Sequence, residues 1–183
     1  MINTNLIENR IELGNTPNVP GLHFRAFQGE PDYPIMAAIF NDSREADKAD
    51  WLSTAEDVRA DYSHLTNCDP ATDMVFAEVA GETVGYGRCW WRDLKEEGRI
   101  YHLFVRLLPQ WRNQGIRRAM LHFLEQRLRT IASEHPANQE KFLSGWAGQG
   151  ETHWHNLLES EGYKIVRYGF DMVRPSLDNI PNC

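Results

Sequence analysis

Hydrophobic residues along this chain alternate with polar residues in some segments and recur every three or four positions in others. Alternation over 22–27 predicts a β-strand. Two more strand-like runs, 74–80 and 83–91, are separated by Gly81 and Glu82. A two-residue connection that begins with glycine is typical of a type II′ turn, so these runs predict a β-hairpin.

Three further segments are expected to be strands. Residues 100–107 are strongly apolar and end before Pro109, which has no N–H group to donate to a neighbouring strand. Residues 141–148 and 163–174 contain shorter apolar runs, and we predict a strand in each. Residues 67–73 are rich in turn-forming residue types and are expected to form a loop.

Two helices are expected before the hairpin, at 32–48 and 53–65. In the second, Thr54 is followed three residues later by Asp57. This spacing allows a capping box, in which each side chain accepts a hydrogen bond from the backbone of the other residue. It therefore marks the start of that helix.

Two more helices are expected later, at 115–133 and at 152–161, where Gly162 is a suitable residue to end the helix. Apolar residues at helical spacing form one face of the longer helix: Leu121, Leu124, Leu128 and Ile131. The predicted order is β, α, α, β, β, β, α, β, α, β. Such an order indicates an α/β (mixed α+β) fold, with helices on the faces of a mixed sheet.

The length of 183 residues suggests one domain. Hydrophobic residues make up 42% and charged residues 25%, values typical of a globular protein. We predict a polar N-terminal lead over 1–20, a domain over 21–174 and a linker-like tail over 175–183.

Several classes of protein are disfavoured. No apolar run approaches the roughly 18 residues of a membrane span, and the N-terminus has no apolar segment of a secretory signal. The net charge of −7 argues against nucleic acid as a partner. The cysteines Cys68, Cys89 and Cys183 match no metal motif, so no metal is expected, and free thiols in the cytoplasm are the simplest interpretation.

One segment has the features of an anion-binding turn. Between Arg106 and Arg129 the chain has six arginines and one acidic residue. Within this stretch, Arg112 and Gly115 lie between the strand 100–107 and the start of the long helix. A helix N-terminus has unpaired N–H groups and a partial positive charge, and glycine allows a ligand to approach the backbone. A solvated helix face is the alternative explanation of the arginines.

The residues of this turn resemble the acetyl-CoA motif of the GNAT superfamily of N-acyltransferases. The matching positions are Val105, Leu107, Pro109, Arg112, Gly115 and Ile116. The hairpin and the segment 157–174 resemble the flanking parts of the same family, so that the resemblance covers about 21–174. It implies a mixed, mostly antiparallel sheet that splays beside the cofactor strand, with helices on both faces.

The resemblance also implies acetyl-CoA as co-substrate and direct attack of a primary amine on the thioester. Pantetheine would run along the strand Leu103 to Leu107. The pyrophosphate would lie on backbone N–H groups of 112–117. The implied cofactor-binding residues are Leu103, Val105, Leu107, Arg112, Asn113, Gln114, Gly115, Ile116 and Arg117.

Three positions depart from the family pattern. Arg117 replaces the usual second small residue of the turn, Leu158 replaces a frequent acid tyrosine, and Glu151 replaces a frequent asparagine. Side chains near a helix start can point outward, so we expect Arg117 to point away from the turn and to assist phosphate binding. The alternative is that its side chain obstructs the site.

Tyr101 and His102 lie on the strand that would flank the thioester, and strand neighbours point to opposite faces, so only one can face the cleft. His102 has the more suitable intrinsic pKa for a base. A structural, hydrogen-bonded histidine is the alternative. Other residues considered are His153, His155, Glu151 and Asp93 for proton transfer, and Trp90, Trp91, Trp146 and Trp154 for an acceptor pocket.

The sequence therefore predicts a cytoplasmic N-acetyltransferase, a monomer or homodimer, that acts on a small-molecule or peptide amine. Because the usual tyrosine is absent and the tail resembles a linker, a catalytically silent acyl-CoA-binding domain is the alternative. The chain could then be one half of a tandem protein. A protein-interaction module with an aromatic surface is a third hypothesis.

Overall fold

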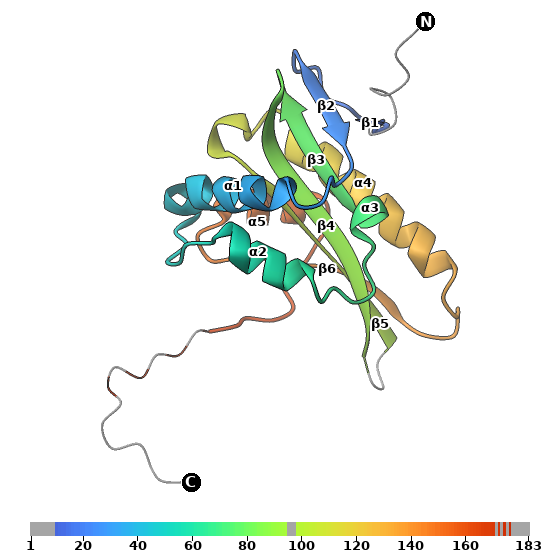
Figure 1. Ribbon diagram of the computed structural model, residues 1–183. Coiled ribbons are helices and arrows are strands. Elements are labelled where there is room, and N and C mark those ends of the chain that lie inside the picture. Colours follow the sequence, from blue (N-terminus) through green and yellow to red (C-terminus); the bar gives the residue numbers. More distant parts are fainter. Residues whose placement is uncertain (1–9, 95–97, 171, 173, 175, 177–183) are drawn as a thin grey trace, which may run out of the picture.

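A computed structural model describes residues 10–94, 98–170, 172, 174 and 176 of the chain (Figure 1). Within these residues the strands form one six-stranded sheet in the order β1-β2-β3-β4-β5-β6. All neighbouring strands are antiparallel except β5 and β6, which are parallel. The strands are β1 (Arg10–Ile11), β2 (Leu22–Arg25), β3 (Met74–Val79), β4 (Glu82–Leu94), β5 (Gly98–Leu107) and β6 (Lys141–Gly145).

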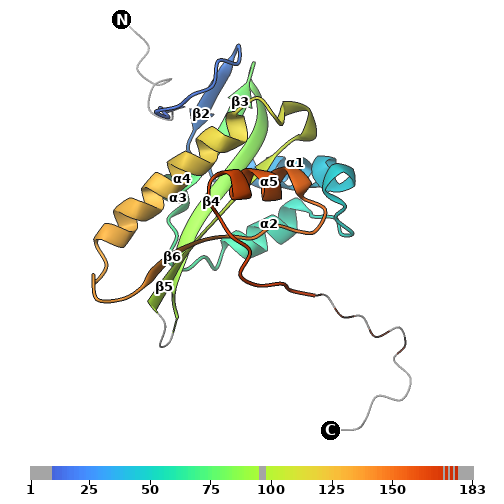
Figure 2. The same ribbon diagram turned by 180° about the vertical axis from the view of Figure 1, so that it is seen from behind.

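Helices cover both faces of the sheet. The helices α1 and α2 lie on the near face in Figure 1, and α4 and α5 lie on the near face in the reverse view of Figure 2. The helices are α1 (Asp32–Asp47), α2 (Ala55–Tyr62), α3 (Pro70–Asp73), α4 (Ile116–Ser133) and α5 (Thr152–Ser160), and a 3₁₀ turn covers Pro109–Trp111. The mixed α/β fold expected from the order of elements is confirmed.

The long strand β5 belongs to both layers. Its odd-numbered side chains, from Tyr101 to Leu107, are buried in the core beneath α4 and α5. Phe104, an even-numbered residue, packs instead against the cluster formed with α1 and α2. Alternate side chains of a strand point to opposite faces, so a single strand contributes to both cores.

Most of the predicted elements are present. The capping box forms at α2, where the Thr54 hydroxyl accepts from the backbone of Asp57 at 3.1 Å and the Asp57 carboxylate accepts from the backbone of Thr54 at 2.9 Å. Gly162 follows α5 with a φ of 89°, as expected for a residue that ends a helix.

Three local predictions were wrong. The hairpin turn is Ala80-Gly81, because Val79 pairs with Glu82, and φ values of 52° and 90° make it type I′ rather than type II′. The expected loop at 67–73 contains the short helix α3, which the Asp69 side chain caps.

The predicted last strand is also absent from the described residues between 163 and 174. Tyr163, at its start, packs on the core, but several later apolar side chains are exposed, including Val166 and Phe170, so little burial holds this segment to the sheet. The tail predicted at 175–183 lies, apart from Ser176, outside the described residues. By contrast, β1 lies within the segment expected to be a polar lead.

Candidate active site

A gap opens between β5 and β6 next to the start of α4. The two strands pair only from Arg99 to Leu103, whereas β5 continues to Leu107. The Leu108 N–H donates to Val84 of β4 at 2.9 Å, so even-numbered backbone groups face β4. The backbone groups of Val105 and Leu107 therefore face the gap, where β6 no longer pairs with them.

The side chain of Arg117 lies inside this gap. Its Nε and Nη2 atoms donate to the Val105 carbonyl at 2.9 and 2.5 Å, and the guanidinium lies 4.6 Å from the centre of the Trp154 ring. Only 2% of the residue is exposed. The side chain points away from the turn, but inward to β5 rather than into solvent, because the first turn of α4 lies over the sheet.

Burial dominates the electrostatics of Arg117. It lowers the pKa of the guanidinium to about 9, with Glu151 raising it and Arg112 lowering it further. The group still carries its charge at neutral pH. Glu151 is a distant counter-ion, with its Oε1 atom 3.8 Å from Nη2 of Arg117 and 3.9 Å from Nη1 of Arg106.

His153 lies beside the same guanidinium, with Nδ1 3.3 Å from Nη1 of Arg117. Burial and then the charges of Arg117 and Arg112 lower the pKa of His153 to about 4, so the imidazole is neutral at neutral pH. Its Nε2 atom lies 3.4 Å from the backbone nitrogen of Asn113, within the predicted phosphate turn. His153 thus connects the gap to the turn.

The turn itself presents backbone N–H groups. Asn113 and Gly115 have positive φ values of 64° and 82°, and no side chain caps the start of α4. The first N–H groups of a helix have no partner within the helix, so they are available to an anion here. A Cβ atom on Gly115 would lie 3.2 Å from the Cβ of Pro17, which leaves little room for a side chain. The turn therefore suits a phosphate group bound by the backbone.

The arginines around the turn are already paired. Arg112 donates to the Leu107 carbonyl at 3.2 Å and to the Asp47 carboxylate at 2.7 Å. Each of the six arginines from Arg106 to Arg129 lies within 4 Å of an acidic group: Arg106 and Arg117 near Glu151, Arg112 near Asp47, Arg118 near Glu161, Arg127 near Asp73 and Arg129 near Glu125. The positive island of the sequence is thus largely neutralised within the fold.

The two predicted catalytic residues lie on opposite faces of the sheet. The buried Tyr101 hydroxyl lies 2.8 Å from Nδ1 of His135, on the α4 side. His102 stacks on Trp90 on the other side, and burial and then Arg92 lower its pKa. Leu158, at the usual tyrosine position, is buried and carries no proton to donate.

A pocket of about 440 Å³ lies on the same face as His102, between the sheet and the helices α1 and α2. Phe104 and Arg106, which flank Val105 on β5, contribute to its wall. The other lining residues are Met36, Phe40, Trp51, Ser53, Val58, Asp61, Tyr62, Tyr86 and Arg88. None of the four tryptophans considered from the sequence is among them, whereas Trp51 is. This volume is within the range of small-molecule sites.

Sequence reasoning missed Tyr62 and Arg88, which belong to an ordinary-looking helix and hairpin. Alternation of side chains along the hairpin strand assigns Arg88 to one face of the sheet. Only the packing of α2 shows that a pocket lies on that face.

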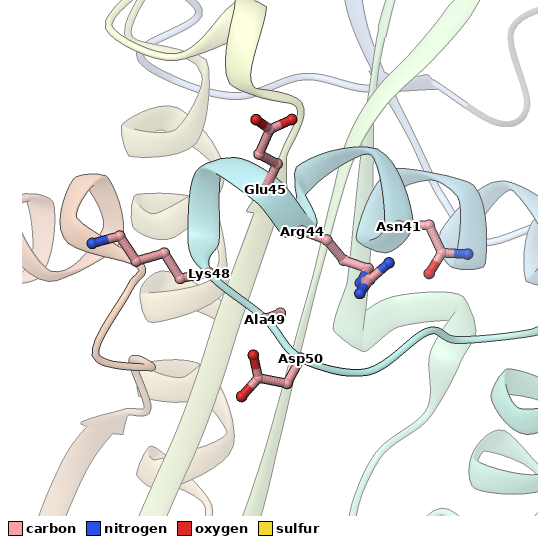
Figure 3. A pocket seen from close by; sticks show the side chains of 6 residues that line it. All are labelled: Asn41, Arg44, Glu45, Lys48, Ala49 and Asp50. Carbon is pink, nitrogen blue, oxygen red and sulfur yellow. The ribbon is translucent and has the colours of Figure 1, made fainter.

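A second hollow, of about 320 Å³, lies at the last turn of α1. Figure 3 shows its six side chains, which point in different directions rather than toward a common centre. No residue of β5 or of the 112–117 turn lines it. It is therefore a weaker candidate for an acceptor site.

Within the described residues, no group of histidine, cysteine or carboxylate side chains could hold a metal ion, and no helix is long and apolar enough to cross a membrane. Cys68 and Cys89 are free thiols, and burial raises the pKa of both. Cys183 lies outside the described residues.

The fold has close counterparts among solved structures of acetyltransferases. A GCN5-related N-acetyltransferase from Sphaerobacter thermophilus has a TM-score of 0.69 and 20% identity, with 82% of this chain and 45% of that chain covered. A predicted acetyltransferase with acetyl-CoA from Clostridium acetobutylicum has a TM-score of 0.58 and 16% identity, and the match covers 83% of this chain and 96% of that chain. A putative acetyltransferase from Salmonella typhimurium with its cofactor acetyl-CoA has a TM-score of 0.57 and 17% identity, and the match covers 80% of this chain and 82% of that chain.

These structures define the fold class as that of the GNAT acetyltransferases. The model of the acetyltransferase (GNAT) family matches residues 36–135, more than half of the chain. The chain belongs to this family. No curated protein sequence matches it. The chain spans less than half of the Sphaerobacter protein, with which it shares the fold.

Proposed function

We propose that the chain is an N-acetyltransferase that binds acetyl-CoA in the gap between β5 and β6 and transfers the acetyl group to a primary amine. The observation that carries this proposal is the separation of the two strands after Leu103. It leaves backbone groups of Val105 and Leu107 directed into the gap, immediately beside an uncapped helix start. Two of the solved structures with this fold contain acetyl-CoA.

The proposed roles divide between backbone and side chains. Backbone groups of Val105 and Leu107 would hold the pantetheine arm, whereas Leu103, also expected to bind it, still pairs with Gly145 of β6, and the Leu107 carbonyl must first release Arg112. Of the expected range 112–117, the N–H groups of 114–117 would hold the pyrophosphate at the uncapped helix start, because those of Arg112 and Asn113 already donate to Pro109 and His153. Acetyl-CoA supplies the activated acetyl group, and the protein positions it and the amine.

The pocket lined by Phe104 and Arg106 is the proposed acceptor site, because it shares β5 with the gap. An incoming ammonium group must lose a proton before it can attack the thioester. We assign this proton to His102, which lies on the pocket's face of the sheet but not in the pocket wall, and whose lowered pKa keeps it neutral at neutral pH. Asp61, which lines the pocket, is the alternative base. Tyr101 is on the opposite face and is proposed to be structural.

Arg117 must move for pantetheine to pair with the Val105 carbonyl, because its guanidinium already bonds to that oxygen. We propose that the ligand displaces this side chain toward the phosphate turn, where its charge remains favourable. The same contact favours a second candidate function, a catalytically silent domain in which Arg117 keeps the gap closed. Leu158, in place of the usual acid, supports that candidate as well.

Two measurements test the proposal. Acetyl-CoA at about 100 times its Kd should stabilise the native state by about 2.7 kcal/mol, which is measurable as a rise in melting temperature. Release of the CoA thiol, followed with a panel of primary amines, then tests transfer. Stabilisation without thiol release above the hydrolytic background would favour the silent domain. Absence of both would refute acetyl-CoA as the ligand.

A further inference from the structure

Arg88, on the hairpin strand β4, lines the pocket beneath α1 and α2, and two of its guanidinium nitrogens lack hydrogen-bond partners among the described residues. Its Nε and Nη1 atoms are inaccessible to solvent and have no hydrogen-bond partner among the described residues. By contrast, Arg25 is paired with Asp32 and Glu78, and Arg112 with Asp47. Buried polar groups are nearly always hydrogen-bonded, so these two atoms call for a further partner, and a ligand in the pocket is the candidate we consider.

Aromatic rings hold the Arg88 guanidinium in place. Its central carbon lies 4.7 Å from the centre of the Tyr62 ring, 5.0 Å from that of Trp90 and 5.6 Å from that of Phe104. Cation–π contacts stabilise the charge without using its N–H groups. The rings therefore fix the position of Arg88 without pairing its Nε and Nη1 atoms, which a ligand in the pocket reaches only when a side chain that covers them shifts.

The charge of the pocket indicates an anionic ligand. Two guanidinium groups, of Arg88 and Arg106, and one carboxylate, of Asp61, line it. Arg106 has only a distant counter-ion, Glu151, at 3.9 Å. The buried Tyr62 hydroxyl also has no hydrogen-bond partner in the part of the chain that the structure describes, and burial raises its pKa, so it remains a neutral donor. The pocket thus offers several donors to an anion and one carboxylate to an ammonium group.

We infer that this pocket recognises an acceptor amine that also carries an anionic group, and that the group is a carboxylate held by Arg88. Arginine is well suited to carboxylates, which it binds through charge-assisted hydrogen bonds. A volume of about 440 Å³ limits the acceptor to a small molecule, such as an amino acid, or to the end of a peptide. This inference rests on the proposed acetyl transfer, but it also predicts binding that does not require transfer.

The test uses matched pairs of amines that differ only in the anionic group. Suitable pairs are phenylalanine with 2-phenylethylamine, β-alanine with ethylamine, and O-phosphoethanolamine with ethanolamine. Thiol release from acetyl-CoA gives kcat/KM for each amine, and calorimetry without acetyl-CoA gives its binding. We expect the carboxylate-bearing member of a pair to be the better substrate and ligand.

Arg88→Gln should lower kcat/KM for the carboxylate-bearing amine by about 10- to 100-fold, since a hydrogen bond to a charged group is lost. The value for the amine without a carboxylate, and the KM for acetyl-CoA, should not change. Arg59→Gln is the matched control: Arg59 lies on the exposed side of α2 and pairs with Glu30 at 2.8 Å, so this variant removes one charge near the pocket but not in its wall. Should Arg88→Gln fail to fold, Arg88→Lys, which keeps the charge, should give a smaller loss with the same selectivity.

Each outcome decides between explanations. Equal losses for both members of a pair, or a wild-type preference for the member without the anionic group, would overturn the inference. A preference for O-phosphoethanolamine over both carboxylate-bearing amines would support binding of an anionic group at Arg88 but would show that this group is not a carboxylate. If no amine is acetylated, Arg88-dependent binding of the carboxylate in calorimetry still supports the pocket while the proposed transfer fails. Absence of both binding and turnover would reject the inference.

Discussion

Replacing Arg117 by alanine tests whether this side chain obstructs the gap. In the free protein, the Val105 carbonyl would lose both of its donors, and a buried unsatisfied carbonyl costs about 1–3 kcal/mol. Loss of the contact with Trp154 costs about 1 kcal/mol more, and removal of a desolvated charge offsets part of the total. We expect a net loss of about 1–3 kcal/mol, which for a chain of this length lowers the melting temperature by about 2–12 °C.

The same change should tighten the binding of acetyl-CoA. In the wild type, a ligand that pairs with the Val105 carbonyl must break a charged hydrogen bond worth about 1.5–3 kcal/mol. The displaced guanidinium recovers about 1 kcal/mol near the phosphates. The difference of about 0.5–2 kcal/mol corresponds to a Kd that is about 2- to 30-fold lower in Arg117→Ala. Because the contact is buried, the gain should persist at high salt.

Isothermal titration calorimetry at low and high salt gives these affinities directly. Arg118→Ala serves as the control, because Arg118 is the next residue of α4, is half exposed and pairs with Glu161 rather than with β5. Its Kd should stay within about twofold of the wild type. A weaker affinity in Arg117→Ala, with a loss that shrinks as salt is raised, would show that the guanidinium binds phosphate and would refute the displacement argument.

Three further changes follow from the same geometry. Gly115→Ala places a Cβ atom on a residue with positive φ, beside Pro17, so it should lower the stability by about 1–2 kcal/mol and also weaken acetyl-CoA binding. Gly162→Ala, at a similar φ but with open space around it, should lower the stability without affecting binding. The pKa of His153 in the folded protein, about 4, is below its usual value of 6.5, so the unfolded chain takes up the proton first as the pH falls. The free energy of unfolding should therefore decrease between pH 6.5 and pH 4, and it should decrease less in His153→Gln. His102→Gln should lower kcat by about 10²–10⁴ and remove the acidic limb of its pH profile, with acetyl-CoA binding unchanged; an unaltered profile would direct attention to Asp61.

The local sequence was sufficient where local chemistry decides the structure. The capping box at Thr54 and the end of α5 at Gly162 depend on hydrogen bonds and dihedral angles within a few residues. Hydrophobic periodicity likewise predicted the hairpin and α4. The turn at Ala80 was displaced by one residue because cross-strand pairing, rather than the position of the glycine, set the register.

The site depended on contacts that the sequence does not encode locally. Arg117 turns inward because α4 packs over the sheet, and its guanidinium there meets the carbonyl of Val105, twelve residues earlier, which no longer pairs with β6. Arg88 became a candidate only when α2 packed over its strand and left its N–H groups unpaired. The arginine island looked like a phosphate site because the acids that neutralise it lie elsewhere in the chain, such as Asp47 and Asp73.

The two-sided character of β5 has a consequence for how this protein can change over evolutionary time. The backbone of Val105 faces the proposed cofactor, while the side chains of Phe104 and Arg106 face the proposed acceptor. Every amino acid except proline has the same backbone groups, so single codon changes at 104 and 106 can alter the acceptor while the contacts to acetyl-CoA are retained. One strand would thus allow selection to act on substrate choice independently of the donor.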